Sequence, residues 1–254
     1  MPELPEVEAR RRMIEHACAD SVLVSVAIEK KGIVKHDDPG IRRRMTGETL
    51  ISVERRGKYL ILVFSDTIRV TLHFGLFGEM AVAGSGETFP SVCARFDFDN
   101  KRTLFLLRWA SVWFGKGVEV LEKLGPDPVA EPGKFTREYL AGVLSGKKTK
   151  IKQCLMDQAI IAGIGAVYAD EILFHAHLLP GRPANSLQSD ESKRLYEAIR
   201  TTMKSAIEKT ESRGDESRPF LSLESRENCP VCGTRIVNTR LAGRRTLYCP
   251  HCQH

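Results

Sequence analysis

The sequence predicts an α+β fold, with a β-sandwich or barrel in the N-terminal half of the chain and helices in the C-terminal half. Runs of alternating or apolar β-forming residues are confined to residues 22–109. After a Gly- and Pro-containing stretch at 125–133, apolar residues recur at helical spacing. Two Cys-x-x-Cys pairs then follow near the C-terminal end. We therefore expect an N-terminal domain over residues 1–130, a helical domain over residues 131–222 and a small module over residues 223–254.

A helix is predicted over residues 3–18, because Leu4, Val7, Ile14 and Cys18 fall on one stripe of a helical surface. Five β-rich runs follow it, separated by Gly, Pro, Asp and Asn, at residues 22–28, 50–64, 68–74, 92–98 and 103–109. In the fourth run apolar and polar residues alternate, which is typical of a strand that is buried on one face.

Two interpretations are open for Pro2 and Glu3. Proline near a helix start pre-sets the backbone, and a carboxylate in the first turn complements the helix dipole. If Met1 is removed, however, Pro2 becomes an N-terminal secondary amine that can attack a carbon such as a sugar C1′. An α-amino group titrates near ~8, so part of it is unprotonated at neutral pH. Glu3 would then move protons beside it.

Helices are expected in the second half at residues 136–144, 150–158, 166–176 and 190–210. Between the second and third lies the apolar turn 160–165, a helix–turn–helix candidate whose backbone N–H groups could face a phosphate. The stretch 147–152 adds four lysines suited to phosphate binding, or to a solvated helix start. The polar segment 210–228 is interpreted as a linker or loop.

Charge and hydropathy limit the partners of this chain. Its 254 residues carry a formal charge of +6, with a pI of about 9.0, which favours nucleic acid but also suits many other proteins. No apolar run approaches the roughly 18 residues of a membrane span, and no signal-peptide pattern is visible. We expect a cytoplasmic protein that does not bind membranes.

The cysteines give the sharpest local signal. Four of the seven form the spacing C-x2-C-x16-C-x2-C, at Cys229, Cys232, Cys249 and Cys252. This spacing predicts one structural, tetrahedral Zn²⁺ site. The basic hairpin expected between the two pairs would suit DNA binding, protein contacts or stability alone. Three scattered cysteines are expected to be buried apolar residues: Cys18, Cys93 and Cys154.

Three separated motifs together carry a resemblance to a known family. They are MPELPEVE at residues 1–8, RRGKYL at 55–60, and CPVCG with YCPHC near the C-terminus. The segments HFGLFG at 73–78 and LMDQAIIAGIGAVYADEILF at 155–174 strengthen it. Over essentially its full length the chain resembles the formamidopyrimidine-DNA glycosylase and endonuclease VIII family. The resemblance implies an N-terminal helix plus β-sandwich domain, a C-terminal helical domain with a helix–two-turn–helix, and a zinc-finger β-hairpin.

The resemblance also implies an activity, that of a bifunctional DNA glycosylase and abasic-site lyase of base-excision repair. Pro2 would attack C1′ of a flipped-out damaged nucleotide, and β- and δ-elimination from the Schiff base would cut the strand. Glu3 would shuttle protons, and Lys58 would assist base loss or elimination. By itself Lys58 would be a surface lysine of a strand.

Residues implied to contact DNA are Glu6 near the everted base, His73, Lys148, Lys152 and the Gly163–Ala166 turn including Gly165, Arg244 in the zinc hairpin, and Leu76 as a wedge. Damaged DNA is the expected partner, and we expect the protein to act as a monomer. Glu6 fits a first-turn carboxylate equally well.

Three departures from the family pattern bear on the substrate. Ala166 stands where the family typically has a phosphate-clasping asparagine, and Val112 and Trp113 replace two arginines that read the orphaned base and bind phosphate. Residues 211–228 lack the longer lesion-capping loop. We expect Trp113 to stack on a base, and we expect a preference for oxidised pyrimidines, hydantoins or abasic sites, including single strands, over 8-oxoguanine. The alternative is a catalytically weak or inactive protein that binds damaged DNA.

Overall fold

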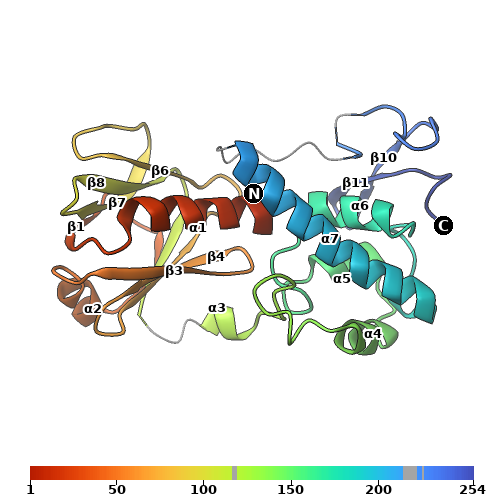
Figure 1. Cartoon of the computed structure of the whole chain (residues 1–254), viewed down its shortest axis with the longest axis horizontal. Coiled ribbons are helices and arrows are strands. Elements are labelled where there is room, and N and C mark those ends of the chain that lie inside the picture. Colours follow the sequence, from red (N-terminus) through yellow and green to blue (C-terminus); the bar gives the residue numbers. More distant parts are fainter. Residues whose placement is uncertain (116–118, 214–221, 225) are drawn as a thin grey trace. The chain divides into compact units, whose positions relative to one another are not determined.

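The computed structural model describes the whole chain except residues 116–118, 214–221 and 225 (Figure 1). The chain divides into two compact units, of which the first comprises Met1–Pro2 and Glu6–Glu122 and the second Glu3–Pro5 and Lys123–His254. The division after Glu122 lies near the boundary predicted at residue 130. The C-terminal cysteine-containing module belongs to the same unit as the helices.

The first unit is a β-sandwich with one long helix. Its elements are α1 (Leu4–Cys18), β1 (Leu23–Ile28), β2 (Val34–Asp37), α2 (Pro39–Arg44), β3 (Leu50–Arg56), β4 (Tyr59–Phe64), β5 (Arg69–His73), β6 (Glu79–Gly84), β7 (Val92–Phe98), β8 (Arg102–Leu107), β9 (Ser111–Phe114) and α3 (Glu119–Glu122). One sheet has the strand order β1-β7-β8-β6 and the other the order β2-β9-β5-β4-β3. Every pairing is antiparallel except that of β2 with β9, which is parallel.

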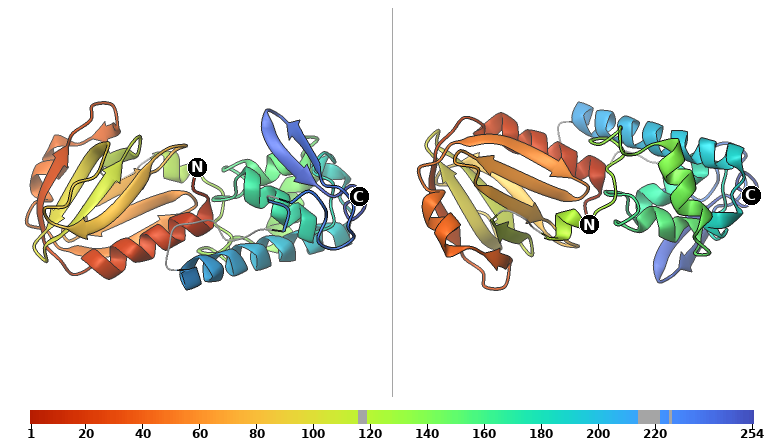
Figure 2. Two further views of the ribbon diagram at one scale, coloured as in Figure 1. Left: turned by 90° about the horizontal axis from the view of Figure 1, so that it is seen from above. Right: turned by 90° about the horizontal axis from the view of Figure 1, so that it is seen from below.

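Helix α1 is part of this sandwich core. Val7, Ile14 and Cys18, three residues of its predicted apolar stripe, lie in one buried cluster with residues of both sheets. Figure 2 shows α1 running alongside the strands of this unit. Burial of such side chains stabilises a fold by roughly 1.5–3 kcal/mol each relative to exposure. The stripe predicted from sequence is therefore the packing surface of the helix.

Several short elements of the first unit were not predicted. The run 50–64 is two strands, because Gly57 takes a positive φ of 58° and reverses the chain between β3 and β4. The short strands β2, β6 and β9 give weak periodic signals, so the sequence did not distinguish them from loops.

The second unit is helical and carries a β-hairpin. Its elements are α4 (Arg137–Ser145), α5 (Ile151–Met156), α6 (Ala166–His175), the 3₁₀ turn η1 (Ala184–Ser186), α7 (Ser189–Arg213), β10 (Val237–Leu241) and β11 (Arg244–Tyr248). The four helices and the hairpin lie where they were predicted. Within this unit, the hairpin β10–β11 extends from its helices, with β11 packed on α6 (Figure 2).

Sequence chemistry explains the ends and the packing of these helices. The Thr136 hydroxyl accepts the N–H of Tyr139 and caps α4, as expected for a threonine at this position. Helix α6 is buried along nearly its whole length, from Tyr168 to Phe174. Helix α7 continues to Arg213, and most of the remaining predicted linker lies outside the described residues. No helix in the described part of the chain has the length and apolar character needed to cross a membrane.

Candidate active site

Glu3 is held by the start of helix α6. Its buried carboxylate accepts the backbone N–H of Gly165 at 2.6 Å, of Val167 at 3.1 Å and of Tyr168 at 3.4 Å. The first N–H groups of a helix have no partner inside the helix, and the helix dipole favours a negative charge there. Glu3 therefore caps α6 in place of a side chain from the helix itself, since Gly165 has none to offer.

The turn before α6 is shaped to receive this N-terminal segment. A Cβ atom on Gly165 would lie 2.3–2.7 Å from the atoms of the Glu3 carboxylate. Gly163 has a φ of 100°, and a Cβ there would lie 2.7 Å from Leu4. The Leu4 N–H also donates to the Gly163 carbonyl at 3.0 Å. Both glycines are thus required by the close approach of residues 3 and 4.

These contacts correct one expectation about the turn. Its N–H groups were predicted to face a phosphate, but that of Gly165 donates to Glu3 and that of Gly163 donates to the Gln158 side chain at 2.9 Å. Gln158 also donates to the carbonyls of Met156 and Ile164 and so closes the turn internally. Gly165 consequently positions Glu3 and does not present a free N–H to DNA.

Pro2 is half-buried and Met1 precedes it with 43% exposure. Glu6, in the first turn of α1, is only 4% exposed, so its carboxylate is a buried group and not part of a solvated helix surface.

Lys58 lies with Gly57 in the tight turn between β3 and β4 and is 6% exposed. The predicted alternative, a solvated lysine on a strand surface, is therefore wrong. The neighbouring Arg55 donates to Glu8 at 2.8 Å and to the Gly57 carbonyl at 3.2 Å, which links helix α1 to this turn. Burial alone would raise the pKa of Glu8, but its hydrogen bonds and charge interactions with Arg55 and Arg11 lower it instead. The Glu8–Arg55 ion pair was not predicted from the sequence. The sequence does place an acidic residue on the predicted helix and an arginine in the RRGKYL motif, but it does not show that the two meet.

His73 lies at the end of β5, stacked on Tyr59 with ring centroids 4.5 Å apart. Burial and the nearby charge of Lys58 lower the pKa of His73 to about 4. Its Nδ1 accepts the Gly75 N–H at 3.2 Å, so the neutral ring carries its proton on Nε2. His73 can therefore donate one neutral hydrogen bond to a phosphate but does not supply a cation at neutral pH.

The loop 74–78 presents two apolar side chains to solvent. Leu76 is 59% exposed and Phe77 is 64% exposed. The base of the loop is fixed, because the Gly78 N–H donates to the Phe74 carbonyl at 2.6 Å and the Arg10 guanidinium lies 4.2 Å from the Phe74 ring centroid. A side chain held outward on a fixed loop suits the wedge role predicted for Leu76.

Val112 and Trp113, which were predicted to stand in place of two arginines, lie in β9. Val112 is fully buried in the sandwich core. Trp113 is half-buried and meets the Tyr59 ring edge-on at 6.0 Å. Neither offers the outward-pointing cation that an arginine would supply.

Lys152 does not fit its predicted contact with DNA. Its side chain is 0% exposed, and its ammonium lies 2.7 Å from Asp170 Oδ1, 2.7 Å from the Arg245 carbonyl and 2.9 Å from Thr246 Oγ1. The second carboxylate oxygen of Asp170 accepts the Leu247 N–H at 2.9 Å. Lys152 and Asp170 thus attach strand β11 to helices α5 and α6.

Burial shifts the pKa values of both Lys152 and Asp170. Burial raises the pKa of Asp170 to about 6 against the opposing effect of the lysine, and it lowers the pKa of Lys152. By contrast, Lys148 before α5 and Arg244 at the start of β11 are exposed, as a contact with DNA requires.

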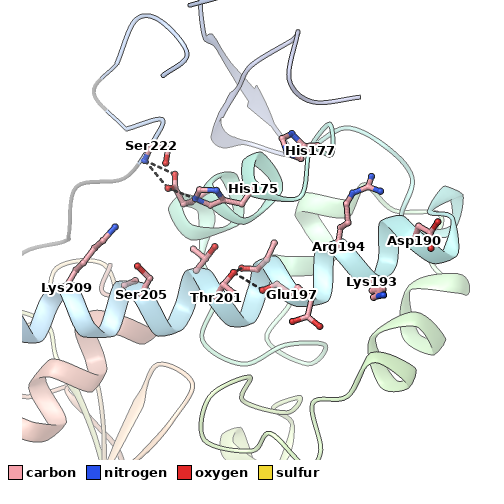
Figure 3. Close-up of a pocket in the computed structure, with 14 residues that line it drawn as sticks. His175, His177, Asp190, Lys193, Arg194, Glu197, Thr201, Ser205, Lys209 and Ser222 are labelled. Atoms are coloured by element: carbon pink, nitrogen blue, oxygen red, sulfur yellow. Dashed lines mark hydrogen bonds and ion pairs between the residues drawn. The ribbon is translucent and has the colours of Figure 1, made fainter. Parts of the chain in front are cut away.

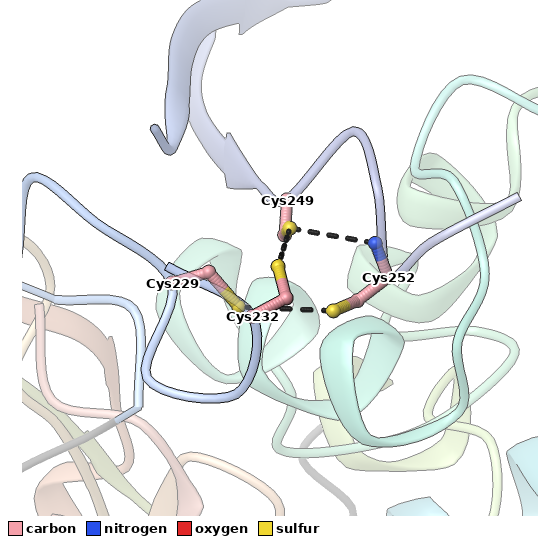
Figure 4. Close-up of side chains that lie close together, drawn as sticks. All are labelled: Cys229, Cys232, Cys249 and Cys252. Carbon is pink, nitrogen blue, oxygen red and sulfur yellow. Dashed lines mark hydrogen bonds between the residues drawn. The ribbon is translucent and has the colours of Figure 1, made fainter. Parts of the chain in front are cut away.

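The four paired cysteines come together at the base of the hairpin (Figure 4). Their sulfur atoms all lie within 4.8 Å of one another, with Cys232 and Cys249 at 3.5 Å and Cys229 and Cys252 at 3.8 Å. A tetrahedron of Zn–S bonds of about 2.3 Å places sulfurs roughly 3.8 Å apart, so this arrangement fits Zn²⁺. The site is structural, because all four tetrahedral positions are taken by cysteine. Cys18, Cys93 and Cys154 are buried, as predicted.

A cavity of about 850 Å³ lies elsewhere in the second unit, along α6 and α7 (Figure 3). Within it Glu171 accepts from the Ser222 N–H at 2.9 Å and pairs with His175 at 3.1 Å. None of the predicted site residues lines this cavity. Although this cavity is large, we therefore do not assign the active site to it.

Comparison with known proteins covers the chain from end to end. Residues 1–107 match the formamidopyrimidine-DNA glycosylase N-terminal domain, residues 124–216 the formamidopyrimidine-DNA glycosylase H2TH domain, and residues 226–254 a zinc finger found in FPG and IleRS. A formamidopyrimidine-DNA glycosylase of Carboxydothermus hydrogenoformans is 34% identical over 271 residues, covering all of both chains. The relative from Neisseria meningitidis is 31% identical, again over all of both chains.

Solved structures give the same result for the fold. A complex between Lactococcus lactis Fpg and DNA containing an abasic site has a TM-score of 0.90 and 27% identity, over 99% of each chain. A complex of the wild-type Lactococcus lactis protein with DNA containing an oxidised pyrimidine has a TM-score of 0.90 and 28% identity, over 99% of each chain.

Proposed function

Because the chain belongs to the formamidopyrimidine-DNA glycosylase family and is a DNA glycosylase with abasic-site lyase activity, we propose that Pro2 is its nucleophile and Glu3 its proton shuttle. The observation that carries this proposal is the capture of the Glu3 carboxylate by three backbone N–H groups of the α6 terminus. A carboxylate fixed in this way holds the adjacent residue, Pro2, in a restricted position. Pro2 acts once Met1 has been removed, because only then is its nitrogen a free secondary amine.

The proposed reaction begins with attack of the Pro2 nitrogen on C1′ of the damaged nucleotide. The C1′–N bond to the base breaks, the base leaves with a proton, and the proline nitrogen loses its own proton. The C1′–O4′ bond then breaks and O4′ takes a proton, which leaves an iminium between Pro2 and the opened sugar. Loss of a C2′ proton then expels the 3′ phosphate, and a second elimination expels the 5′ phosphate. Glu3 gives and accepts the protons of these steps near C1′ and the sugar ring.

Lys58 and His73 are proposed to act on the DNA beside this centre. They lie close enough for the lysine charge to lower the pKa of the histidine. The Lys58 ammonium suits a phosphate or the opened sugar, and His73 would donate its Nε2–H to a phosphate oxygen. Exposed Lys148 and Arg244 are proposed as phosphate contacts, and Leu76 as the wedge that fills the gap left by the flipped base.

The lesion preference is proposed from the recognition residues. Val112 is buried and Trp113 half-buried where the family has two arginines, so hydrogen bonds from those positions to the orphaned base are lost. We propose oxidised pyrimidines, hydantoins or abasic sites, including those in single strands, as substrates preferred over 8-oxoguanine. We also propose that a cytoplasmic monomer is the active form.

The proposal is tested by borohydride trapping on oligonucleotides that carry an abasic site, 8-oxoguanine, thymine glycol or a hydantoin, each single- and double-stranded. A covalent adduct forms only if an amine has made a Schiff base. Pro2→Gly leaves a primary amine and should weaken trapping, whereas extension of the chain before Pro2 should abolish it. Mass spectrometry of the intact protein reports whether Met1 has been removed.

Two outcomes would contradict parts of the proposal. Equal trapping by the extended protein would exclude Pro2 as the nucleophile. Faster cleavage of 8-oxoguanine opposite cytosine than of hydantoin or abasic sites would contradict the substrate preference. Binding of damaged DNA without any adduct, in protein lacking Met1, would favour the alternative of a catalytically inactive damage-binding protein.

A further inference from the structure

Trp109, and not Trp113, is the exposed tryptophan of this protein. Trp109 is 60% exposed, whereas Trp113 is half-buried in β9 against the edge of Tyr59. Among the described residues, the large apolar side chains classed as exposed include only two aromatic ones, Trp109 and Phe77. A single exposed apolar side chain is common on protein surfaces, so exposure alone assigns no role to Trp109.

The second observation is a cation on the Trp109 ring. The Lys30 ammonium lies 3.2 Å from the ring centroid. The residue nevertheless stays 60% exposed, so a large part of the indole remains open to solvent beside the ammonium. A cation next to an exposed indole has the chemistry that suits a nucleotide, because a base stacks on the ring while a phosphate meets the cation.

Both residues are held on fixed backbone. Arg108 adopts a φ of 62° and donates its N–H to the Ser91 carbonyl at 2.7 Å, which fixes the turn that carries Trp109. The Lys30 N–H donates to the Cys93 carbonyl at 3.2 Å, at the start of the neighbouring strand β7. The Arg108 side chain itself is 3.2 Å from Glu79, so Lys30 is the cation that faces the ring.

The third observation is that Trp109 lies beside the loop 74–78, which carries the proposed wedge Leu76. A Cβ atom built on Gly75 would lie 3.9 Å from the Trp109 carbonyl oxygen, so the turn containing Leu76 and Phe77 starts next to Trp109. A wedge inserted at a lesion leaves an unpaired base on the opposite strand, within reach of side chains that flank the wedge.

We propose that Trp109 and Lys30 form a stacking site for an unpaired nucleobase and its phosphate. This inference rests on the proposed function, since it assigns part of the DNA contact of the same enzyme. Stacking accepts every base, because each has a π face. The site therefore holds the base opposite the lesion without reading its hydrogen-bonding pattern, and the protein discriminates little between the four opposite bases.

Tryptophan fluorescence separates the two indoles, since the chain contains only two tryptophans. In Trp113→Phe protein Trp109 is the sole reporter, and in Trp109→Phe protein Trp113 is. We expect DNA containing an abasic site to quench Trp109 strongly and an intact duplex to quench it much less. Quenching confined to Trp113, or equal quenching of Trp109 by both DNAs, would overturn the stacking site.

Affinity measurements complete the test. Loss of one stacked base is expected to raise the Kd of Trp109→Ala for abasic-site duplex about tenfold. Trp109→Phe, which keeps an aromatic ring, should retain most of the affinity. Ile51→Ala, which changes a 53% exposed apolar residue of β3, is the control and should leave the Kd unchanged. A Trp109→Ala protein that binds as tightly as wild type would contradict the inference.

Trapping distinguishes the failure of this inference from that of the proposed function. Wild-type protein that traps abasic DNA, together with an unchanged Kd in Trp109→Ala, overturns the stacking site alone. Wild-type protein that neither binds nor traps abasic DNA overturns both.

Discussion

The turn at residues 157–165 and the loop at residues 74–78 are both short connections with two glycines. They differ in whether their groups face the protein interior or the solvent. The turn directs its groups inward, since Gly163 and Gly165 donate to Gln158 and Glu3 and its isoleucines are buried. The loop directs Leu76 and Phe77 outward into solvent.

This difference indicates which part of the molecule tolerates change. A residue of the turn is limited by van der Waals contact with the N-terminal segment, so even one added methyl group displaces the Glu3 carboxylate. Leu76 and Phe77 of the loop, like Trp109 beside it, are largely exposed to solvent. The exposed loop can therefore change in sequence while the turn that holds Glu3 keeps its geometry.

The largest effect is expected from Lys152, which leads into the inward-facing turn. Lys152→Met leaves the buried Asp170 without its cation and should destabilise the protein by about 3–5 kcal/mol in urea unfolding. Lys148→Met, four residues earlier and exposed, should change stability by less than about 0.5 kcal/mol. Lys148→Met should instead weaken DNA binding. It should also reduce the slope of the logarithm of the binding constant against the logarithm of salt concentration by about one.

The double variant Lys152→Met with Asp170→Leu provides the matched control. Because it removes both buried charges, it should recover much of the lost stability. A Lys152→Met protein as stable as wild type, with weaker DNA binding, would restore the predicted DNA contact and contradict the structural role.

The next effect is expected from Gly165→Ala. The φ of Gly165 is −122°, which alanine adopts freely, so the cost arises from the approach of Cβ to the Glu3 carboxylate. A displacement of about 1 Å at a reacting group can reduce the rate about 100-fold. We expect a loss of that size in single-turnover abasic-site cleavage, with DNA affinity changed little.

Gly142→Ala is the control for this substitution. Gly142 lies in α4 with open space around its Cβ position, so alanine should keep activity and add up to about 1 kcal/mol of stability. Cleavage by Gly165→Ala at the wild-type rate would show that Glu3 does not need its present position.

A smaller effect concerns His73, at the base of the outward-facing loop. Its pKa is about 4 in the folded protein against 6.5 in the unfolded chain, because of burial and the charge of Lys58. The stability that this neutral ring contributes is therefore fully present above pH 6.5. It is lost as the pH falls towards 4, at up to about 1.4 kcal/mol per pH unit.

His73→Gln should flatten this dependence in unfolding experiments between pH 6.5 and 4. NMR titration of the folded protein should show the His73 ring neutral at pH 6. A titration midpoint near 6.5 would instead make His73 a cation available to phosphate.

The sequence was sufficient to predict the elements with strong periodicity and the residues with fixed spacing. The stripe of α1, the four helices of the second unit and the four cysteines were predicted because each signal lies within one local segment. The periodicity predicted residues 50–64 as one β-rich run and did not show where it divides into two strands, because one glycine with positive φ is a weak signal.

The roles of Lys152 and of the tryptophans could not be predicted locally. Lys152 resembles the other lysines of its stretch, and only its distant partners Asp170, Arg245 and Thr246 show that it is buried. The choice between Trp109 and Trp113 depends on which indole the sheets cover. Such differences arise from tertiary contacts, which one sequence does not contain.

The smallest predicted effect tests whether the start of α6, directly after the inward-facing turn, can gain a contact with DNA. Ala166, the first residue of α6, is half-buried and lines a cavity of about 50 Å³ beside Arg245 and Leu247. Ala166→Asn introduces the amide that the resemblance to the family predicts at this position. One hydrogen bond to a phosphate should tighten binding of abasic-site duplex about fivefold, equivalent to ~1 kcal/mol. Ala166→Leu fills the same space without a donor and should not tighten binding. Equal affinities of the asparagine and leucine variants would show that no phosphate reaches this end of α6, and that the turn serves only to hold Glu3.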